Sequence, residues 1–433
     1  MKKYYFNKLN KIEIDKLCIR SAINYDQILE KVRPIVDEVK KEGDLALRKY
    51  TLLLDQVKLD NFLVSEKEMA LGAKQLSIET KRALKVAYKN IIKFHKKQKP
   101  NSFSVETMPG IVCSRESRAI EKVGLYIPSG SAPLPSTVLM LGIPALLAGC
   151  KDVVLCTPPQ LDGGVAPSIL YAAGLCGITQ IYKVGGAQAV AAMAYGTESV
   201  PKVYKIFGPG NQYVTAAKML VSIDPAGAAI DMPAGPSEIL VVADNDSRAD
   251  FVAADLLSQA EHSPDSAVGL ICISENKLDE IINEVYKQAD VLSRKEVALQ
   301  SVQNGFAVVA ENIEIALGFA NDYAPEHLLL NIDEAEKYVD KIINAGSVFL
   351  GQYACESIGD YASGTNHTLP TYGYARMYSG ISVENFMKMI TFQKISSTGV
   401  LNIATTVMEL AQTEGLMAHR RAMEIRVDYL NSL

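Results

Sequence analysis

Short β-branched runs that alternate with helix-like stretches dominate the chain from about residue 120 onwards. Strands and helices that alternate in this way form βαβ units, in which a parallel sheet is buried on both faces. The runs fall into two series, at 123–127, 152–156, 180–184 and 203–207, and then at 238–243, 267–273, 305–310, 327–332 and 347–351. We therefore expect an α/β protein with two Rossmann-like parallel-sheet domains.

The segments that flank this alternation have a different pattern. Residues 22–98 have helical periodicity and many charges, and we interpret the lysine-rich face at 65–98 as a solvated helix surface. The tail from about 382 has helical stretches at roughly 403–414 and 416–429 and no convincing strand. We expect helical N- and C-terminal extensions around the two sheets.

A chain of 433 residues exceeds what one hydrophobic core serves, so two to four domains of roughly 100–150 residues are expected. We place an N-terminal extension at 1–21, a discontinuous first Rossmann-like domain with a helical N-terminal part at 22–120 and 238–381, a second at 122–237, and a C-terminal arm at 382–433.

Charge and composition narrow the class of function. The net charge is −5 with acids and bases interspersed, which favours neither a nucleic-acid partner nor a membrane surface. The longest apolar run, 136–150, is too short for a membrane span and contains Pro144. Seven cysteines without a CxxC pair and an N-terminus without a secretory signal indicate a cytoplasmic protein with reduced thiols. A small-molecule substrate is the default expectation.

Gln259 and His262 are the first candidate pair. An apolar helix that begins near Asp250 brings them onto one face, and their i, i+3 spacing can offer two ligands to one metal ion. Pro264 then ends the helix and leaves His262 at its terminus. A histidine that caps the carbonyls of the helix end explains the same pattern equally well.

Glu326 and His327 lie where a proline-containing loop enters an apolar strand. Adjacent Glu and His side chains offer two general bases of different strength to one cleft. Solvation of the strand start is the simpler explanation for this dipeptide taken alone.

Two polar segments near the C-terminus add further candidates. The stretch 359–376 has almost no aliphatic content and supplies Asp360 as an oxygen ligand and His367 as a lower-ranked candidate. At 413–426, Glu414 closes one helix and His419 lies in the first turn of the next. This second segment is also consistent with a plain helix junction.

The sequence has neither a GxGxxG motif nor a P-loop. Glycine-containing strand ends occur instead at 126–133, 184–192 and 207–214, and each precedes a helix. A helix N-terminus after such a turn can hold a phosphate, so three of them in one βαβ series favour a nucleotide.

Taken together, these segments resemble the histidinol dehydrogenase family over about residues 25–426. The resemblance is carried by GLYIPSGSAPLPSTVLMLGIPA, IFGPGNQYVTAAK, DMPAGPSEILVVAD, ADLLSQAEH, YAPEHL, GDYASGTNHTLPTYGYAR and GLMAHRRAMEIR, in the family's order. It implies oxidation of L-histidinol to L-histidine through L-histidinaldehyde, with two NAD⁺ consumed and one Zn²⁺ per subunit of a homodimer. The competing enzyme class is a zinc hydrolase, and a third alternative is a non-catalytic nucleotide-binding module.

The resemblance also implies roles for single residues. The zinc ligands would be Gln259, His262, Asp360 and His419, which would also contact substrate. His327 would act as the base toward the alcohol, and Glu326 would activate water. Ser237 and Glu414 would hold the substrate, together with His327. The NAD contacts would be Tyr126, Gln188 and Asn211 in the 122–237 domain. The arm at 382–433 would be exchanged in the dimer, so that Glu414 and His419 reach the partner's site.

Overall fold

The computed structural model describes residues 1–20, 25–129, 132–233 and 235–433. The chain forms two compact units. We call the larger one, Met1–Gln98 with Ile120–Asn385, the main unit, and the smaller one, Lys99–Ala119 with Phe386–Leu433, the C-terminal unit. Among the described residues, no helix has both the length and the apolar character needed to cross a membrane. The seven cysteines are all free thiols.

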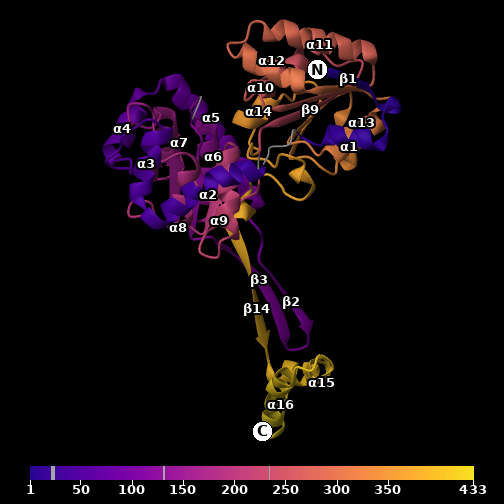
Figure 1. Ribbon diagram of the computed structural model, residues 1–433. Coiled ribbons are helices and arrows are strands. Elements are labelled where there is room, and N and C mark those ends of the chain that lie inside the picture. Colours follow the sequence, from indigo (N-terminus) through magenta and orange to yellow (C-terminus); the bar gives the residue numbers. More distant parts are fainter. Residues whose placement is uncertain (21–24, 130–131, 234) are drawn as a thin grey trace. The chain divides into compact units, whose positions relative to one another are not determined.

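The main unit contains a six-stranded parallel sheet in the order β1-β11-β10-β9-β12-β13 (Figure 1). Its strands are β1 (Lys2–Tyr5), β9 (Glu238–Ala243), β10 (Ala267–Cys272), β11 (Phe306–Val309), β12 (His327–Asn331) and β13 (Ser347–Leu350). The five strands expected from the second series of apolar runs are confirmed. The N-terminal segment, which we expected to be an extension, supplies edge strand β1 of this sheet.

Helices cover both faces of the six-stranded sheet (Figure 1). One face packs against α10 (Ala249–Ala260), α11 (Glu275–Ala289) and α12 (Lys295–Asn304). The other packs against α1 (Lys11–Cys18) and α13 (Ile313–Tyr323). The short helix α14 (Glu356–Tyr361) follows β13 and contacts α10. Burial on both faces explains why these strands read as continuous apolar runs.

A second parallel sheet in the main unit has the order β6-β5-β4-β7-β8. Its strands are β4 (Lys122–Tyr126), β5 (Asp152–Thr157), β6 (Gln180–Lys183), β7 (Lys205–Phe207) and β8 (Ala229–Ile230). The helices that alternate with them are α6 (Pro135–Ala148), α7 (Pro167–Leu175), α8 (Gly186–Tyr195) and α9 (Gln212–Ile223). The fold class of two Rossmann-like parallel-sheet domains is therefore confirmed.

The helical segment 22–98 packs differently from our expectation. Its helices are α2 (Tyr25–Glu42), α3 (Asp44–Leu54), α4 (Glu66–Gln75) and α5 (Ile78–His95). The apolar face of α2 shares one core with α8 and α9, while α4 and α5 contact α7 and α6. Residues 62–64 also hydrogen-bond to β6. The assignment of this segment to the 238–381 domain is wrong, because an apolar helix face does not specify which sheet it covers.

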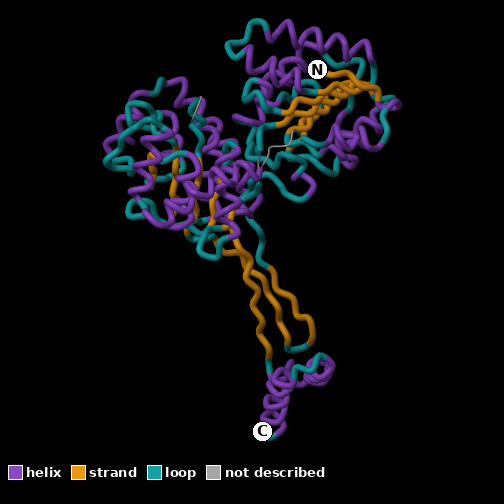
Figure 2. Tube along the Cα trace, viewed as in Figure 1, coloured by secondary structure: helices purple, strands orange, loops and turns teal. Residues whose placement is uncertain are grey.

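The C-terminal unit combines an antiparallel sheet with two helices. The strands run in the order β14-β3-β2, with β2 (Phe103–Met108), β3 (Ile111–Ala119) and β14 (Met387–Ile395) side by side (Figure 2). The helices α15 (Ser397–Thr413) and α16 (Met417–Asn431) are the two expected ones. The expectation of no strand after 382 is wrong. Eight of the nine residues of β14 are exposed, so its sequence lacks the buried apolar run that marks the other strands.

Candidate active site

Glu326 and His327 lie at the amino end of β12, next to the amino end of β9. Both are buried, with 6% and 3% of their surface exposed. His327 is opposite Ile239 in β9 and Ser347 in β13. The dipeptide is thus not a solvated strand start, which was the simpler explanation of its sequence. Two ionisable side chains without solvent need partners from the protein or a ligand.

The backbone of Glu238, the first residue of β9, contacts both side chains. Its N–H donates to Glu326 Oε2 at 2.8 Å, and its carbonyl oxygen lies 3.0 Å from His327 Nδ1. A carbonyl oxygen can only accept, so the imidazole carries a proton on Nδ1. The Nε2 atom of His327 is therefore the nitrogen that can accept or donate a proton in a reaction.

A second element, α14, brings two carboxyl groups to this imidazole. Asp360 Oδ1 lies 3.3 Å from His327 Nε2, and Glu356 Oε1 lies 4.0 Å from His327 Nδ1. One ligand atom from each of the three residues falls within 4.8 Å of the others. Within the described part of the chain, His327 Nε2 and Asp360 Oδ1 are both buried without a hydrogen-bond partner. A proton shared between these two atoms, or a cation that Asp360 binds, would satisfy them.

Burial and charge perturb the ionisation of this cluster. Burial raises the pKa of Glu326 and of Glu356 to about 8 each. Burial acts to lower the pKa of His327, but Glu326 and then Asp360 raise it well above its usual value. Burial acts to raise the pKa of Asp360, whereas His327, His367 and His262 around the carboxyl hold it below its usual value. Shifts of this kind are typical of a functional site.

Gln259 enters the cluster from α10, which ends at Ala260. The amide is 1% exposed, and its hydrogen bonds are satisfied when Nε2 donates to Glu356 and Oε1 accepts from the Glu238 N–H at 3.1 Å. His262 lies beyond the helix, in a turn where its N–H donates to the Gln259 carbonyl. The helix ends before His262, so it does not carry both side chains on one face as expected.

His367 belongs to the same region although we ranked it lower. Its Nδ1 lies 2.8 Å from the carbonyl oxygen of Asp360, and its Nε2 lies 3.1 Å from Thr137 Oγ1 in α6. The carbonyl contact fixes the proton on Nδ1, so Nε2 accepts from the Thr137 hydroxyl. His367 therefore links the α14 segment to the helix that follows β4.

Of three further predicted residues, Ser237 adjoins Glu238 in the chain, whereas Glu414 and His419 come from the C-terminal segment. Ser237 directly precedes β9, where its carbonyl oxygen accepts from the Ala267 N–H. Glu414 is the C-cap of α15, Gly415 has a φ of +71°, and His419 lies in the first turn of α16. Glu414 and His419 are exposed and belong to the C-terminal unit. The helix junction expected from this sequence is confirmed.

The glycine-containing turns lie at the carboxyl edge of the five-stranded sheet, where open α/β sheets bind ligands. The Tyr126 hydroxyl accepts from the Gly186 N–H at 3.1 Å, and Asn211 caps α9 through two backbone N–H groups. Gly208 has a φ of +128°, and a Cβ there would collide with the Tyr126 carbonyl oxygen. Residues 130 and 131 of the first turn lie outside the described residues.

Gln188 supplies a buried polar group at this edge. The side chain is 1% exposed, and its Oε1 has no hydrogen-bond partner within the described residues. Its Nε2 lies 3.5 Å from Asp55 Oδ2, and burial raises the pKa of Asp55 to about 6. A buried amide oxygen beside the N-terminus of α8 fits a polar ligand such as a nucleotide.

Sequence reasoning missed Glu356, Glu238 and Asp55. Glu356 precedes Asp360 by four residues, a spacing that puts both on one helix face. This pair could therefore have been found from the sequence. Glu238 contributes to the cluster through its backbone, which has no sequence signature. Asp55 lies far along the chain from the turns that it approaches.

Comparisons with known proteins identify one family across nearly the whole chain. The family model described as histidinol dehydrogenase matches residues 18–427. The chain is 50% identical to histidinol dehydrogenase of Vibrio parahaemolyticus, over 99% of both chains, and to the chloroplastic histidinol dehydrogenase of Arabidopsis thaliana, over 99% of this chain and 91% of the relative.

A crystal structure of histidinol dehydrogenase from Elizabethkingia anophelis is 49% identical to this chain. It superposes with a TM-score of 0.95 and covers 100% of this chain and 99% of that one. A match of this length does not favour the zinc-hydrolase alternative or a non-catalytic module. The chain belongs to the histidinol dehydrogenase family of oxidoreductases.

Proposed function

We propose that this chain oxidises L-histidinol to L-histidine through L-histidinaldehyde, with two molecules of NAD⁺ consumed per histidinol. The observation that carries the proposal is the buried Glu326–His327 pair, in which His327 Nε2 lies 3.3 Å from Asp360 Oδ1. Oxidation of an alcohol requires a base that takes the hydroxyl proton, in a site from which water is excluded.

The bound metal in this proposal is one Zn²⁺ per subunit, held by Gln259, His262, Asp360 and the partner subunit's His419. An amide, a carboxylate and two imidazoles form a harder donor set than a thiolate cage and leave room for substrate atoms. In the hydrogen-bonded orientation the amide nitrogen of Gln259 faces Glu356. Rotation of the amide would turn its oxygen to that side, where it can join the ligand set. When bound, the ion would orient the imidazole and amino groups of the substrate.

NAD⁺ would bind at the carboxyl edge of the five-stranded sheet, through Tyr126, Gln188 and Asn211. Support comes from the unpartnered Gln188 Oε1 and from the helix N-termini at this edge. When bound, NAD⁺ accepts the hydride in each oxidation step.

His327 would act in the first oxidation. Its Nδ1–H is held by the Glu238 carbonyl, which fixes the ring and leaves Nε2 to take the hydroxyl proton of the alcohol. As that proton leaves the oxygen, a hydride leaves the carbon, and the alcohol becomes an aldehyde. The pKa of His327 is high while the nearby carboxylates are uncompensated, so positive charge in the site would favour the neutral base.

Glu326 would act in the second oxidation. The carboxylate takes a proton from the water that adds to the aldehyde, and loss of a second hydride from the hydrate gives the carboxylate of histidine. The Glu238 N–H holds Oε2, so Oε1 is the oxygen that remains for the water. Ser237 and Glu414 would hold the polar ends of the substrate, together with the four metal ligands and His327.

A homodimer with shared sites is part of this proposal. The C-terminal unit exposes large apolar side chains on its strands, including Phe103, Val105, Ile390 and Phe392, which are 53%, 50%, 37% and 44% exposed. The strand pairing puts Phe103 and Val105 on one face of the sheet and Ile390 and Phe392 on the other, so the sheet exposes apolar side chains on both faces, which is typical of a surface that a partner covers. Exchange of the unit in a dimer would cover it and would bring Glu414 and His419 to the partner's site.

His419→Asn is expected to lower zinc affinity by at least about 10²-fold and to abolish histidinol oxidation, because one of four ligands is lost. The side chain is exposed, so the free energy of unfolding of the metal-free protein should change by less than about 0.5 kcal/mol. Zinc titration and chemical denaturation measure the two effects. Asp428→Asn on the same helix is the control, and unchanged zinc affinity in His419→Asn would remove this residue from the ligand set.

The function itself is tested by product analysis. Zinc-loaded protein incubated with L-histidinol and NAD⁺ should yield L-histidine, identified by mass spectrometry. A reaction with ¹⁸O-labelled water should put label into the new carboxylate, because one of its oxygens comes from water. Histidinol that remains unchanged in the presence of zinc and NAD⁺ would contradict the proposal.

A further inference from the structure

Glu238 holds both proposed bases through its backbone alone. Its N–H is bound to Glu326 and its carbonyl to His327, at 2.8 and 3.0 Å. A shift of the Glu238 backbone would therefore move both side chains together. The contacts that fix Glu238 therefore also fix the positions of Glu326 and His327.

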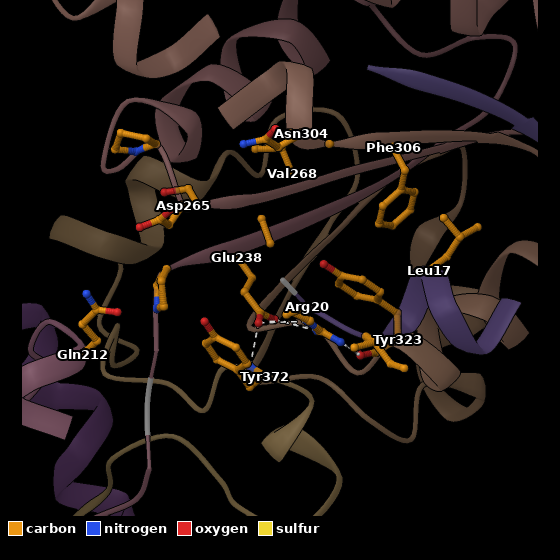
Figure 3. A pocket seen from close by; sticks show the side chains of 16 residues that line it. Leu17, Arg20, Gln212, Glu238, Asp265, Val268, Asn304, Phe306, Tyr323 and Tyr372 are labelled. Carbon is orange, nitrogen blue, oxygen red and sulfur yellow. Dashed lines mark hydrogen bonds and ion pairs between the residues drawn. The ribbon is translucent and has the colours of Figure 1, made fainter. Parts of the chain in front are cut away.

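The side chain of Glu238 is fixed by a buried ion pair with Arg20. Arg20 Nε donates to Oε1 at 2.9 Å and Nη2 donates to Oε2 at 2.6 Å, a two-pronged contact between planar groups. The Tyr372 N–H donates to the same Oε1 at 2.6 Å. Glu238 is 0% and Arg20 8% exposed. Figure 3 shows the guanidinium of Arg20 beside the Glu238 carboxylate, with Tyr372 on the other side.

The remaining donors of Arg20 reach the loop that carries the bases. Nη1 donates to the carbonyl oxygens of Tyr323 and Cys18, and Nη2 donates to that of Ala324. The guanidinium also stacks on the Tyr323 ring, 3.6 Å from its centroid. Ala324 has a φ of +51°, so the chain turns sharply there, two residues before Glu326. All five N–H donors of the guanidinium are used.

Arg20 therefore joins the two backbone segments that form the site, the start of β9 and the loop that enters β12. A buried ion pair is weak evidence for a role in stability, because an apolar pair of similar size often serves as well. The Arg20–Glu238 pair differs in its position, because Glu238 and the 323–324 carbonyls lie next to the two proposed bases. Lysine could not replace it, because an ammonium has three donors and no planar fork.

We propose that Arg20 is a positioning residue, which holds Glu326 and His327 in their working geometry through Glu238 and the 323–324 carbonyls; the proposal rests on the proposed function of these two bases. Displacement of a catalytic group by about 1 Å can lower a rate by about 10²-fold. Arg20 touches neither base directly, so its effect should fall on the turnover step more than on the binding of NAD⁺.

The test uses Arg20→Lys in the zinc-loaded, full-length protein. We expect kcat for histidinol to fall by about 10- to 100-fold, with KM for NAD⁺ within about twofold of the unmodified value. Glu238→Gln keeps the shape of the side chain and removes its charge. It should likewise lower kcat for histidinol and leave KM for NAD⁺ nearly unchanged. Both residues line a cavity of about 310 Å³, so a changed side chain has room there.

Arg248→Lys is the matched control. Arg248 makes the same two-pronged contact with Asp250, at 3.1 and 2.6 Å, but on the exposed surface of the main unit. Its kcat should equal that of the unmodified protein. Rates are divided by the fraction of folded, zinc-loaded chains, measured by circular dichroism and zinc content, so that loss of fold is not counted as loss of positioning.

A corrected kcat for Arg20→Lys within about twofold of the unmodified protein would overturn the proposal. So would a parallel loss in Arg248→Lys, because the effect would then not depend on the site. Absence of histidinol oxidation by the unmodified protein would contradict the proposed function instead, so the two failures are distinguishable.

Discussion

Glu326→Gln is expected to uncouple the two oxidations, with aldehyde formed and histidine formation lowered by about 10²- to 10⁴-fold. Glutamine keeps the shape of the side chain and can still accept from the Glu238 N–H, but it cannot take a proton from water. His327 is unchanged, so the first hydride transfer should continue. The measurement is the yield of histidine and of aldehyde trapped by hydroxylamine, each per histidinol consumed.

Glu261→Gln is the control for this prediction, because Glu261 adjoins His262 in the sequence and has no role in the proposed chemistry. It should form histidine at the unmodified rate. Histidine formation by Glu326→Gln at a rate similar to the control would exclude Glu326 as the base for water.

The pH dependence of the second step follows from the same residue. Burial raises the pKa of Glu326 to about 8, so the neutral acid is favoured below that pH. A base must be ionised, and the rate of aldehyde oxidation should therefore rise with pH. A bound cation nearby lowers a carboxyl pKa, so the midpoint should lie at or below about 8. A rate that falls as pH increases from 6 to 8 would contradict this assignment.

Asp360→Asn is expected to lower zinc affinity by at least about 10²-fold and to reduce histidinol oxidation in proportion to the lost metal. Asp360 belongs both to the four predicted ligands and to the buried group of His327, Glu356 and Asp360. The substitution removes a charged ligand and keeps its volume. Dialysis against zinc buffers, followed by metal analysis, measures the affinity.

Asp246→Asn, at an exposed position after β9, is the control and should bind zinc as the unmodified protein does. Far-ultraviolet circular dichroism should be the same for both variants, because α14 keeps its backbone. Full zinc occupancy in Asp360→Asn would show that the metal site lies elsewhere.

The sheets could be predicted because burial leaves a direct trace in sequence. Each strand of β4–β7 and β9–β13 lies in a continuous apolar run, since helices cover both faces of its sheet. Strand β14 gave no such signal, because most of its residues are exposed and its pairing partner β3 lies more than 250 residues earlier in the chain. The contact of α2 with α8 and α9 was not predictable either, since an amphipathic face fits any apolar surface.

The site was harder to predict because its parts are local patterns of low specificity. Gln259, Glu326 and Asp360 each come from a different segment, and topology alone brings them together around His327. Family resemblance supplied the connection that spacing could not. It did not identify Arg20 and Glu238, whose contribution runs through backbone atoms and ion pairing.

The amount of NADH formed per histidinol measures whether one site carries out both oxidations. Histidinol is made limiting, NAD⁺ and zinc are in excess, and the reaction runs to completion. We expect about two molecules of NADH for each histidinol consumed, because a base for the alcohol and a base for water lie side by side in one site. One NADH per histidinol, with the aldehyde left in solution, or no NADH from the zinc-loaded protein, would contradict this expectation.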